Sequence, residues 1–401
     1  MTALRPLVVR VLAAAMLLSA QAGLRSLYAD EVPPPSPPSS CRLKTQVELE
    51  LEQIVDRAYR SCLGTRTVAG VDLVVRIPFG QSGERRGGAG FYQRIFLGGK
   101  GDPERIWTEI DRVLASEAFA DYASGLRRPG DKTVIFDLEQ RRASVYFDPT
   151  LNDLLREGLY PGTRTKVYVL KTSSRISSTD VYNFLYCIGA VGLDCSGFIY
   201  NAQKAIAAAF GLDLDRRAAA DLGTGAEQLP GIIGLWFFDP ESSFSDVVDD
   251  RIDNLRPGDV ILFRGRVPGR GIWFRHSAVI QSVDFERGLI RYLQCTDWAT
   301  PEERGVHDSW VRFDPADPKI SLGDLSLEWS QTIQPTFAGE TPLRYWQNDG
   351  HRYRSYREQG GSLIVRLKAI KALVLAREPD FYKNVYGLSA GAKEGKTVPP
   401  R

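Results

Sequence analysis

A long helical run followed in order by three strand-like runs is the feature that most constrains this fold. After Asp194, small and apolar side chains recur at spacings of three and four from Cys195 to Gly211, which predicts one helix. DVILF, HSAVIQSV and LIRYLQC then have the composition of strands, and the last two are separated by a turn that ends at Gly288. A helix and a hairpin in this order predict an α+β fold.

The start of the chain has the pattern of an export signal. Arg5 and Arg10 precede the apolar run VLAAAMLLSA, and a small-residue cleavage site ends at Ala22, so we interpret residues 1–22 as a signal peptide. The run is shorter than the roughly 20 residues that cross a bilayer. We therefore expect the chain to be exported to the periplasm or cell envelope, without stable membrane insertion after signal cleavage. Residues 23–42, which contain VPPPSPPSS, predict a Pro-rich linker.

The rest of the chain divides by pattern into two regions and a tail. Residues 43–175 predict an α+β accessory region of unknown role, with helices starting after Thr45 and Asp102. They contain no recognisable nucleophile, metal or phosphate motif. Residues 176–386 hold the helix and strands described above, with a late segment, SLIVRLKAIKALVL, that predicts a strand running into a helix. Residues 387–401 read as a polar tail.

Charge and cysteine content narrow the classes of function. Lys and Arg number 51 and Asp and Glu 49, a net charge of +2, which does not favour nucleic acid as a partner. The five cysteines are an odd number, so in an exported chain at least one thiol is left over after pairing. We expect that thiol to be Cys195. Cys41 with Cys62, and Cys187 with Cys295, are possible pairs that spacing alone does not establish.

Cys195 is the candidate nucleophile because it starts the predicted helix. A helix N-terminus presents unpaired N–H groups and partial positive charge, which favour a thiolate over a thiol and can stabilise an oxyanion. The alternative is a buried cysteine that packs as a small apolar residue. Among the three histidines, His276 lies on a predicted strand and is the candidate base, whereas His307 and His351 look like loop or surface residues.

A third residue must orient the imidazole and fix its tautomer. Gln294 and Asp297 lie on the returning strand, eighteen and twenty-one positions beyond His276. In a hairpin without bulges, side chains alternate between the two faces, so only one of these two residues can lie on the face of His276.

DCSGF at a helix start, then RPGDVILF, HSAVI and a polar residue on the next strand, resembles the NlpC-type cell-wall endopeptidases over about 180–296. The resemblance implies a papain-like core, in which the helix carrying Cys195 packs on an antiparallel sheet, and a catalytic triad of Cys195, His276 and Gln294. We assign substrate contacts to Tyr186, Asp194 and Ser196. The stretch from Cys195 to His276 is longer than is usual in the family, with an insertion around 231–250. Trp236 and Phe237 of this insertion are either cleft-lining or core side chains.

By the same resemblance, the expected activity is hydrolysis of amide bonds in peptidoglycan stem peptides, without metal or organic cofactor. Two alternatives remain open. One is a related cysteine amidase or acyltransferase that acts on another amide or on an ester. The other is a non-catalytic cell-envelope module that retains the motif. The sequence does not indicate an oligomeric state.

Overall fold

The fold is mixed α+β, as the sequence predicted. The computed structural model describes residues 44–80, 97–99, 102–137, 141–148, 150–151, 165–170, 175–189, 191–267, 271–296, 304–329, 331–332 and 347–383. The expected signal peptide, Pro-rich linker and polar tail lie outside these residues, and so does Asp297.

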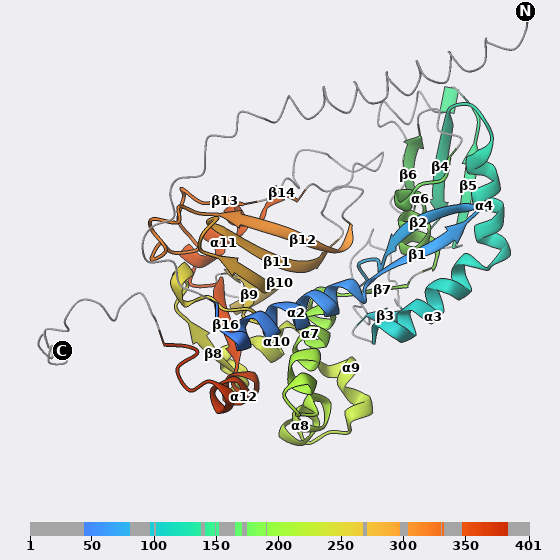
Figure 1. Ribbon diagram of the computed structural model, residues 1–401. Helices are drawn as coiled ribbons and strands as arrows, with labels where there is room; N and C mark the ends of the chain where they lie inside the picture. Colours follow the sequence, from blue (N-terminus) through green and yellow to red (C-terminus); the bar gives the residue numbers. More distant parts are fainter. Residues whose placement is uncertain are drawn as a thin grey trace, which may run out of the picture. The chain divides into compact units, whose positions relative to one another are not determined.

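A seven-stranded sheet with antiparallel neighbours is the centre of the fold, and its strands follow the order β13, β12, β11, β10, β9, β16, β8 (Figure 1). Its strands are β8 Ser245–Val248, β9 Val260–Val267, β10 Gly271–Asp284, β11 Leu289–Thr296, β12 Gly305–Arg312, β13 Glu328–Trp329 and β16 Leu363–Leu367. The predicted strands DVILF, HSAVIQSV and LIRYLQC lie in β9, β10 and β11.

The hairpin formed by β10 and β11 positions the candidate base. Its turn ends at Gly288, which has a φ of 62° and lies so close to Phe313 that an added Cβ would stand 2.1 Å from the Phe313 carbonyl oxygen. Only glycine suits such a position. Beyond the turn, a one-residue register shift between Ile280 and Ser282 makes Ala278 pair with Gln294.

Smaller sheets account for the remaining strands. β1 Leu63–Val68 pairs with β2 Val71–Arg76, β3 Leu97–Gly99 with β7 Val191–Leu193, and β14 Gln331–Thr332 with β15 Gln347–Asn348. A three-stranded sheet contains β5 Arg142–Tyr146, β4 Lys132–Asp137 and β6 Thr165–Leu170, in that order.

The helices include every one that the sequence predicted. They are α2 Gln46–Arg60, α3 Pro103–Leu114, α4 Glu117–Arg127, α6 Ser178–Phe184, α7 Cys195–Ala209, α8 Leu214–Leu222, α9 Leu229–Ile232, α10 Leu235–Phe238, α11 Asp349–Glu358 and α12 Lys368–Arg377. Short turns of other helix types are η1 Leu185–Gly189, η2 Ala226–Gln228, η3 Pro240–Ser242 and η4 Ile252–Asn254. Thr45 and Asp102 cap α2 and α3 as expected, each accepting a hydrogen bond from a backbone N–H of the first turn.

Two apolar clusters lie on opposite faces of the large sheet. Val279 and Leu293 belong to the cluster that also contains the apolar side chains of α2 and α7. Alternate residues of the same strands, such as Ala278 and Tyr292, belong to the other cluster, which contains Tyr353 of α11. The sheet therefore has α2 and α7 on one face and α11 on the other (Figure 1).

The boundary expected at 175/176 does not divide the structure, because Arg42–Arg401 form one compact unit. The physical reason is α2, whose Leu51, Ile54 and Val55 are buried in the same cluster as α7. The backbone of Glu52 also accepts a hydrogen bond of 3.0 Å from Gln281 on β10. The first helix is thus part of the core of the large sheet.

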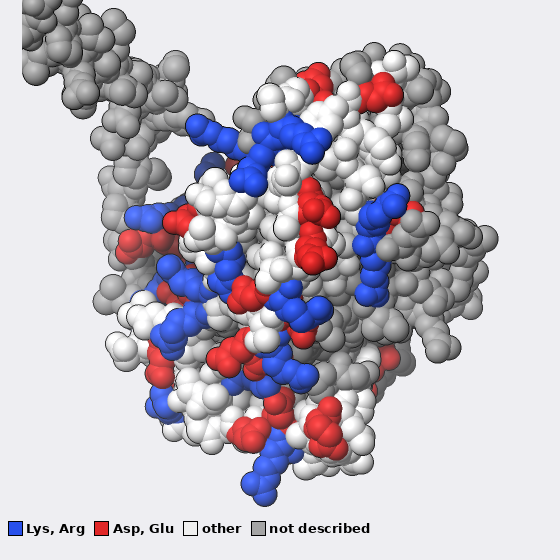
Figure 2. All heavy atoms as spheres, turned by 90° about the vertical axis from the view of Figure 1, so that its right-hand side faces the viewer, with Lys and Arg blue, Asp and Glu red and all other residues white. Residues whose placement is uncertain are grey.

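Charged side chains are mixed over the molecular surface drawn in Figure 2. Lys and Arg alternate there with Asp and Glu, and the described residues of this face form no extended area of a single sign. This distribution agrees with the net charge of +2.

Candidate functional site

Cys195 is the first residue of α7, as predicted, and its side chain is buried. Asp194 caps the helix: its Oδ1 accepts hydrogen bonds from the Gly197 N–H at 2.5 Å and from the Ser196 hydroxyl at 3.0 Å. Asp194 and Ser196, expected to contact substrate, therefore bond to each other and to the helix start. Their cap fixes the first turn and the N–H groups around Cys195.

His276 and Gln294 are in direct contact. The Nε2 atom of His276 lies 2.7 Å from Oε1 of Gln294, and both side chains are buried. Gln294 lies on the same sheet face as His276 because the hairpin shifts its register by one residue between Ile280 and Ser282, after which Ala278 pairs with Gln294. Without that shift, the pairing that starts at Asp284 and Leu289 would place Gln294 on the opposite face.

The neighbours of Gln294 determine which nitrogen of His276 carries the proton. The Gln294 Nε2 group donates to the Ser309 hydroxyl at 2.8 Å and to Oδ2 of Asp349 at 2.9 Å. The amide oxygen therefore faces His276, and an oxygen can only accept. A neutral His276 ring must then carry its proton on Nε2, which leaves a lone pair on Nδ1.

The surroundings keep the His276 ring neutral. Burial, with a smaller contribution from the nearby Arg352 guanidinium, lowers the pKa of His276 to about 3, and the hydrogen bond to Gln294 opposes this only in part. At neutral pH the ring is therefore an uncharged imidazole, the form in which Nδ1 accepts a proton.

The His276 ring lies on the face of the large sheet opposite to the cluster that contains α7. Within the described residues, the hydrogen bond of the His276 ring goes to Gln294. His276 pairs with Phe263 of β9, and the centroids of the two rings are 5.5 Å apart. Both rings lie on the sheet face that α11 covers. α7 packs on the opposite face, and a β-bulge between Phe274 and His276 lies in the strand between them.

His307 is buried, so its expected placement in a loop or at the surface was wrong. It lies on β12 directly opposite Gln294, and its Nδ1 donates to the Gly305 carbonyl at 3.0 Å. Its Nε2 has no hydrogen-bond partner among the described residues, and burial lowers the pKa of the ring to about 4. The signal that could have found this strand is the run of Val306, Trp310 and Val311 after Gly305. His351 is exposed, as expected, but on a helix.

Tyr186, the remaining predicted substrate contact, is half-buried just upstream of α7. Its ring stacks on Tyr182 with a centroid distance of 5.9 Å and an interplanar angle of 10°. Tyr186 belongs to η1, a π-helical turn, a rare conformation that often occurs at functional sites. In the insertion, Phe237 is a core side chain of the α7 cluster, and Trp236 packs against that cluster.

The possible disulfides are not formed among the described cysteines. Cys62, Cys187, Cys195 and Cys295 are all buried thiols, and the Cys295 thiol donates to the Leu193 carbonyl at 3.0 Å. The suggested Cys187–Cys295 pair is therefore absent. The described residues contain no group of three or more His, Cys, Asp or Glu side chains arranged to hold a metal ion.

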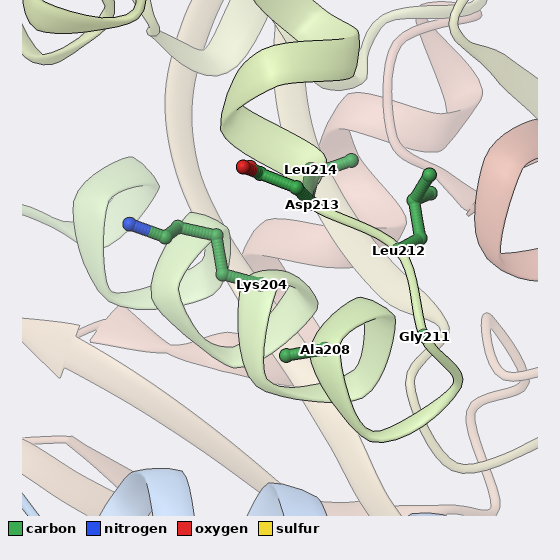
Figure 3. A pocket seen from close by; sticks show the side chains of 6 residues that line it. All are labelled: Lys204, Ala208, Gly211, Leu212, Asp213 and Leu214. Atoms are coloured by element: carbon green, nitrogen blue, oxygen red, sulfur yellow. The ribbon is translucent and has the colours of Figure 1, made fainter.

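The hollow drawn in Figure 3 lies away from the candidate site. It has a volume of about 350 Å³ and is lined by residues from the second half of α7 and from the segment after it, among them Lys204, Gly211 and Asp213. Cys195 is at the other end of that helix. An ion pair of 2.6 Å between Lys204 and Asp215 lies beside it, so the hollow contains none of the candidate catalytic groups.

Comparison of the chain with protein-family models, curated proteins and solved structures found no match. Among the described residues, no helix has both the length and the apolar content to span a bilayer.

Proposed function

We propose that this chain is an exported cysteine hydrolase with a papain-like core, which cleaves amide bonds in peptidoglycan stem peptides. Cys195 is the nucleophile, His276 the general base and Gln294 the residue that orients the imidazole. The observation that carries the proposal is the hydrogen bond of 2.7 Å between His276 Nε2 and Gln294 Oε1, because it leaves Nδ1 ready to accept a proton. The substrate class comes from the resemblance of DCSGF, RPGDVILF and HSAVI to the NlpC-type endopeptidases.

The proposed reaction has two steps. His276 Nδ1 takes the thiol proton, Cys195 Sγ attacks the amide carbonyl, and N–H groups at the start of α7 stabilise the oxyanion. The protonated ring then gives its proton to the leaving amine. Departure of the amine leaves the acyl group bound to Cys195 as a thioester. Water, deprotonated by the same ring, attacks the thioester and releases the acid and the thiol.

The proposal is tested with purified sacculi. Cys195→Ala should abolish release of soluble muropeptides while leaving the circular dichroism spectrum unchanged, because only the attacking sulfur is lost. Cys62→Ala is the matched control, since it removes another buried thiol and should retain activity. Undiminished hydrolysis by Cys195→Ala would end the assignment. Mass spectrometry of the products identifies the new terminus, which distinguishes a peptidase from an amidase or acyltransferase.

A second candidate function has an observation in its favour. His276 and Gln294 are buried on the sheet face that α11 covers, beside Asp349 of that helix, and Cys195 lies on a helix at the opposite sheet face. This arrangement suits a non-catalytic envelope module in which the polar cluster stabilises the core. In that case the motif binds a partner or glycan and performs no chemistry.

Chemical cross-linking separates the two candidates. Dibromoacetone has two reactive carbons flanking one carbonyl, so it joins a sulfur to a ring nitrogen only when the two approach each other closely. The enzyme proposal predicts that peptide maps will contain a bridge between Cys195 and His276. Cys195→Ala is the negative control, because it lacks the sulfur that would form the bridge. Alkylation of Cys195 alone, with no bridged peptide, would favour the binding module.

A further inference from the structure

The Gln294 side chain is held at both ends of its amide. Its oxygen faces His276, and its NH₂ group donates to Ser309 and to Asp349. All four side chains are buried, so water does not compete for these hydrogen bonds. The NH₂ group of the amide therefore lies toward Ser309 and Asp349, and its oxygen lies toward His276.

These two partners differ in what they can enforce. A serine hydroxyl both donates and accepts, so Ser309 is compatible with either orientation of the amide. An ionised carboxylate only accepts, so Asp349 is compatible with one orientation alone. The Tyr292 hydroxyl donates to the same Oδ2 atom at 2.9 Å, which also requires this oxygen to act as an acceptor.

We propose that Asp349 is a positioning residue: its carboxylate holds the Gln294 amide in the one orientation that keeps the proton of His276 on Nε2 and leaves Nδ1 free to act as the base. This inference rests on the proposed function for the role of Nδ1. The control of the tautomer can be observed without any turnover.

The location of Asp349 gives the C-terminal segment a role in the site. Asp349 is the first residue of α11, far beyond the part of the chain, about 180–296, that carries the family resemblance. Arg352, one turn later on the same helix, contributes to the electrostatic environment of His276. α11 thus supplies both the group that sets the tautomer and a cation that disfavours protonation of the ring.

Burial of the Asp349 carboxylate supports a specific role. A buried carboxylate is costly unless its hydrogen bonds compensate for lost water. Asp349 is 1% exposed, and two of its hydrogen bonds come from Tyr292 and Gln294. A neutral residue would fill the same space at lower cost but would not force the amide to present its oxygen to His276.

The test uses ¹⁵N spectra of ring-labelled histidine in the full-length protein, which has only three histidines. Replacement of His351 and His307 in turn assigns the signals. The wild type should show His276 with a protonated Nε2 and an unprotonated Nδ1. Asp349→Asn, which is nearly isosteric but can also donate, should shift the ring toward the Nδ1–H tautomer. Ser309→Ala, which removes a hydrogen bond from the same amide group, should leave the tautomer unchanged.

Kinetics provide a second readout. Asp349→Asn should lower kcat about 10- to 100-fold, the range seen when a residue that orients a reactive group is lost, with KM little changed. An unaltered His276 tautomer in folded Asp349→Asn, or an equal shift in Ser309→Ala, would overturn the proposal. If Asp349→Asn does not fold, an Nδ1–H tautomer in the wild type would overturn it equally. A tautomer shift without hydrolysis by the wild type would support the role of Asp349 and contradict the enzymatic function instead.

Discussion

Two of the three histidines lose nearly all contact with water when the chain folds. His276 and His307 are 3% and 0% exposed, and burial lowers the pKa of the first to about 3 and of the second to about 4. Among the described residues, the His276 ring bonds to Gln294 and the His307 ring to the Gly305 carbonyl. Neither bond compensates for the loss of hydration that a charged ring would suffer. Both imidazole rings are therefore uncharged at physiological pH.

The burial of these rings predicts a stability that falls on acidification. In the unfolded chain both histidines titrate near pH 6.5, whereas in the folded protein they stay neutral down to about pH 4. Between these values the unfolded state binds more protons, so the free energy of unfolding should fall by about 1.4 kcal/mol per pH unit for each histidine. The contribution is fully present above the unfolded pKa and is lost as the pH falls through this window.

Urea denaturation at about pH 7 and about pH 5 measures this slope. His307→Gln should reduce the difference in the free energy of unfolding between the two pH values, because one linked proton is removed. His351→Gln, at an exposed position of α11, should leave that difference unchanged. An equal loss of stability in wild type and His307→Gln would show that His307 does not take up a proton on unfolding.

At the scale of elements, the two helices on opposite faces of the sheet contribute different chemistry. α7 provides Cys195 and the N–H groups of its first turn, held by the Asp194 cap. α11 provides Asp349 and Arg352, which surround the His276–Gln294 pair from the other side. The strands β10 and β11 lie between them, and the bulge before His276 is the local irregularity in β10 closest to the ring. Bulges of this kind commonly redirect side chains next to active sites.

The elements with regular patterns were predictable from the sequence. α2 and α7 carry apolar side chains at helical spacing, and β9, β10 and β11 are apolar runs bounded by turns, so periodicity identified them. Gln294 was selected over Asp297 through the family resemblance, and its contact with His276 agrees with that choice. Strand alternation alone could not make the selection, because the one-residue register shift between Ile280 and Ser282, which decides the face of Gln294, has no signal in the sequence.

α11 and β12 were not predictable in the same way. The α11 sequence, DGHRYRSYRE, is mostly polar, and the helix is held by tertiary contacts such as those of the buried Tyr353. Without the helix, nothing in the sequence links Asp349 to Gln294, fifty-five positions away. His307 was misplaced because polar residues break the apolar pattern of β12, although the buried strand pairs fully with β11.

At the scale of the whole molecule, α2 joins the start of the described chain to the sheet that carries the site. Its apolar face packs in the α7 cluster, and Arg291 of β11 forms an ion pair of 2.7 Å with Asp56. The Arg291 guanidinium also lies 5.3 Å from the centre of the Tyr59 ring. On the far side, Arg377 of α12 pairs with Glu50 at 2.9 Å. These contacts explain why a boundary near 175 has no structural counterpart.

A chain that begins at residue 176 should therefore fail to fold cooperatively, although it contains every candidate catalytic residue. Loss of α2 uncovers the surface against which Leu51, Ile54 and Val55 pack, and each of these side chains contributes about 1.5–3 kcal/mol on burial. Their sum is comparable with the roughly 5–15 kcal/mol that stabilises a typical domain. Thermal unfolding followed by circular dichroism should show no sharp transition for residues 176–401 and a sharp one for residues 44–401. A cooperative transition in the shorter chain would mean that the sheet and α7 form an independent domain, with α2 a dispensable addition to it.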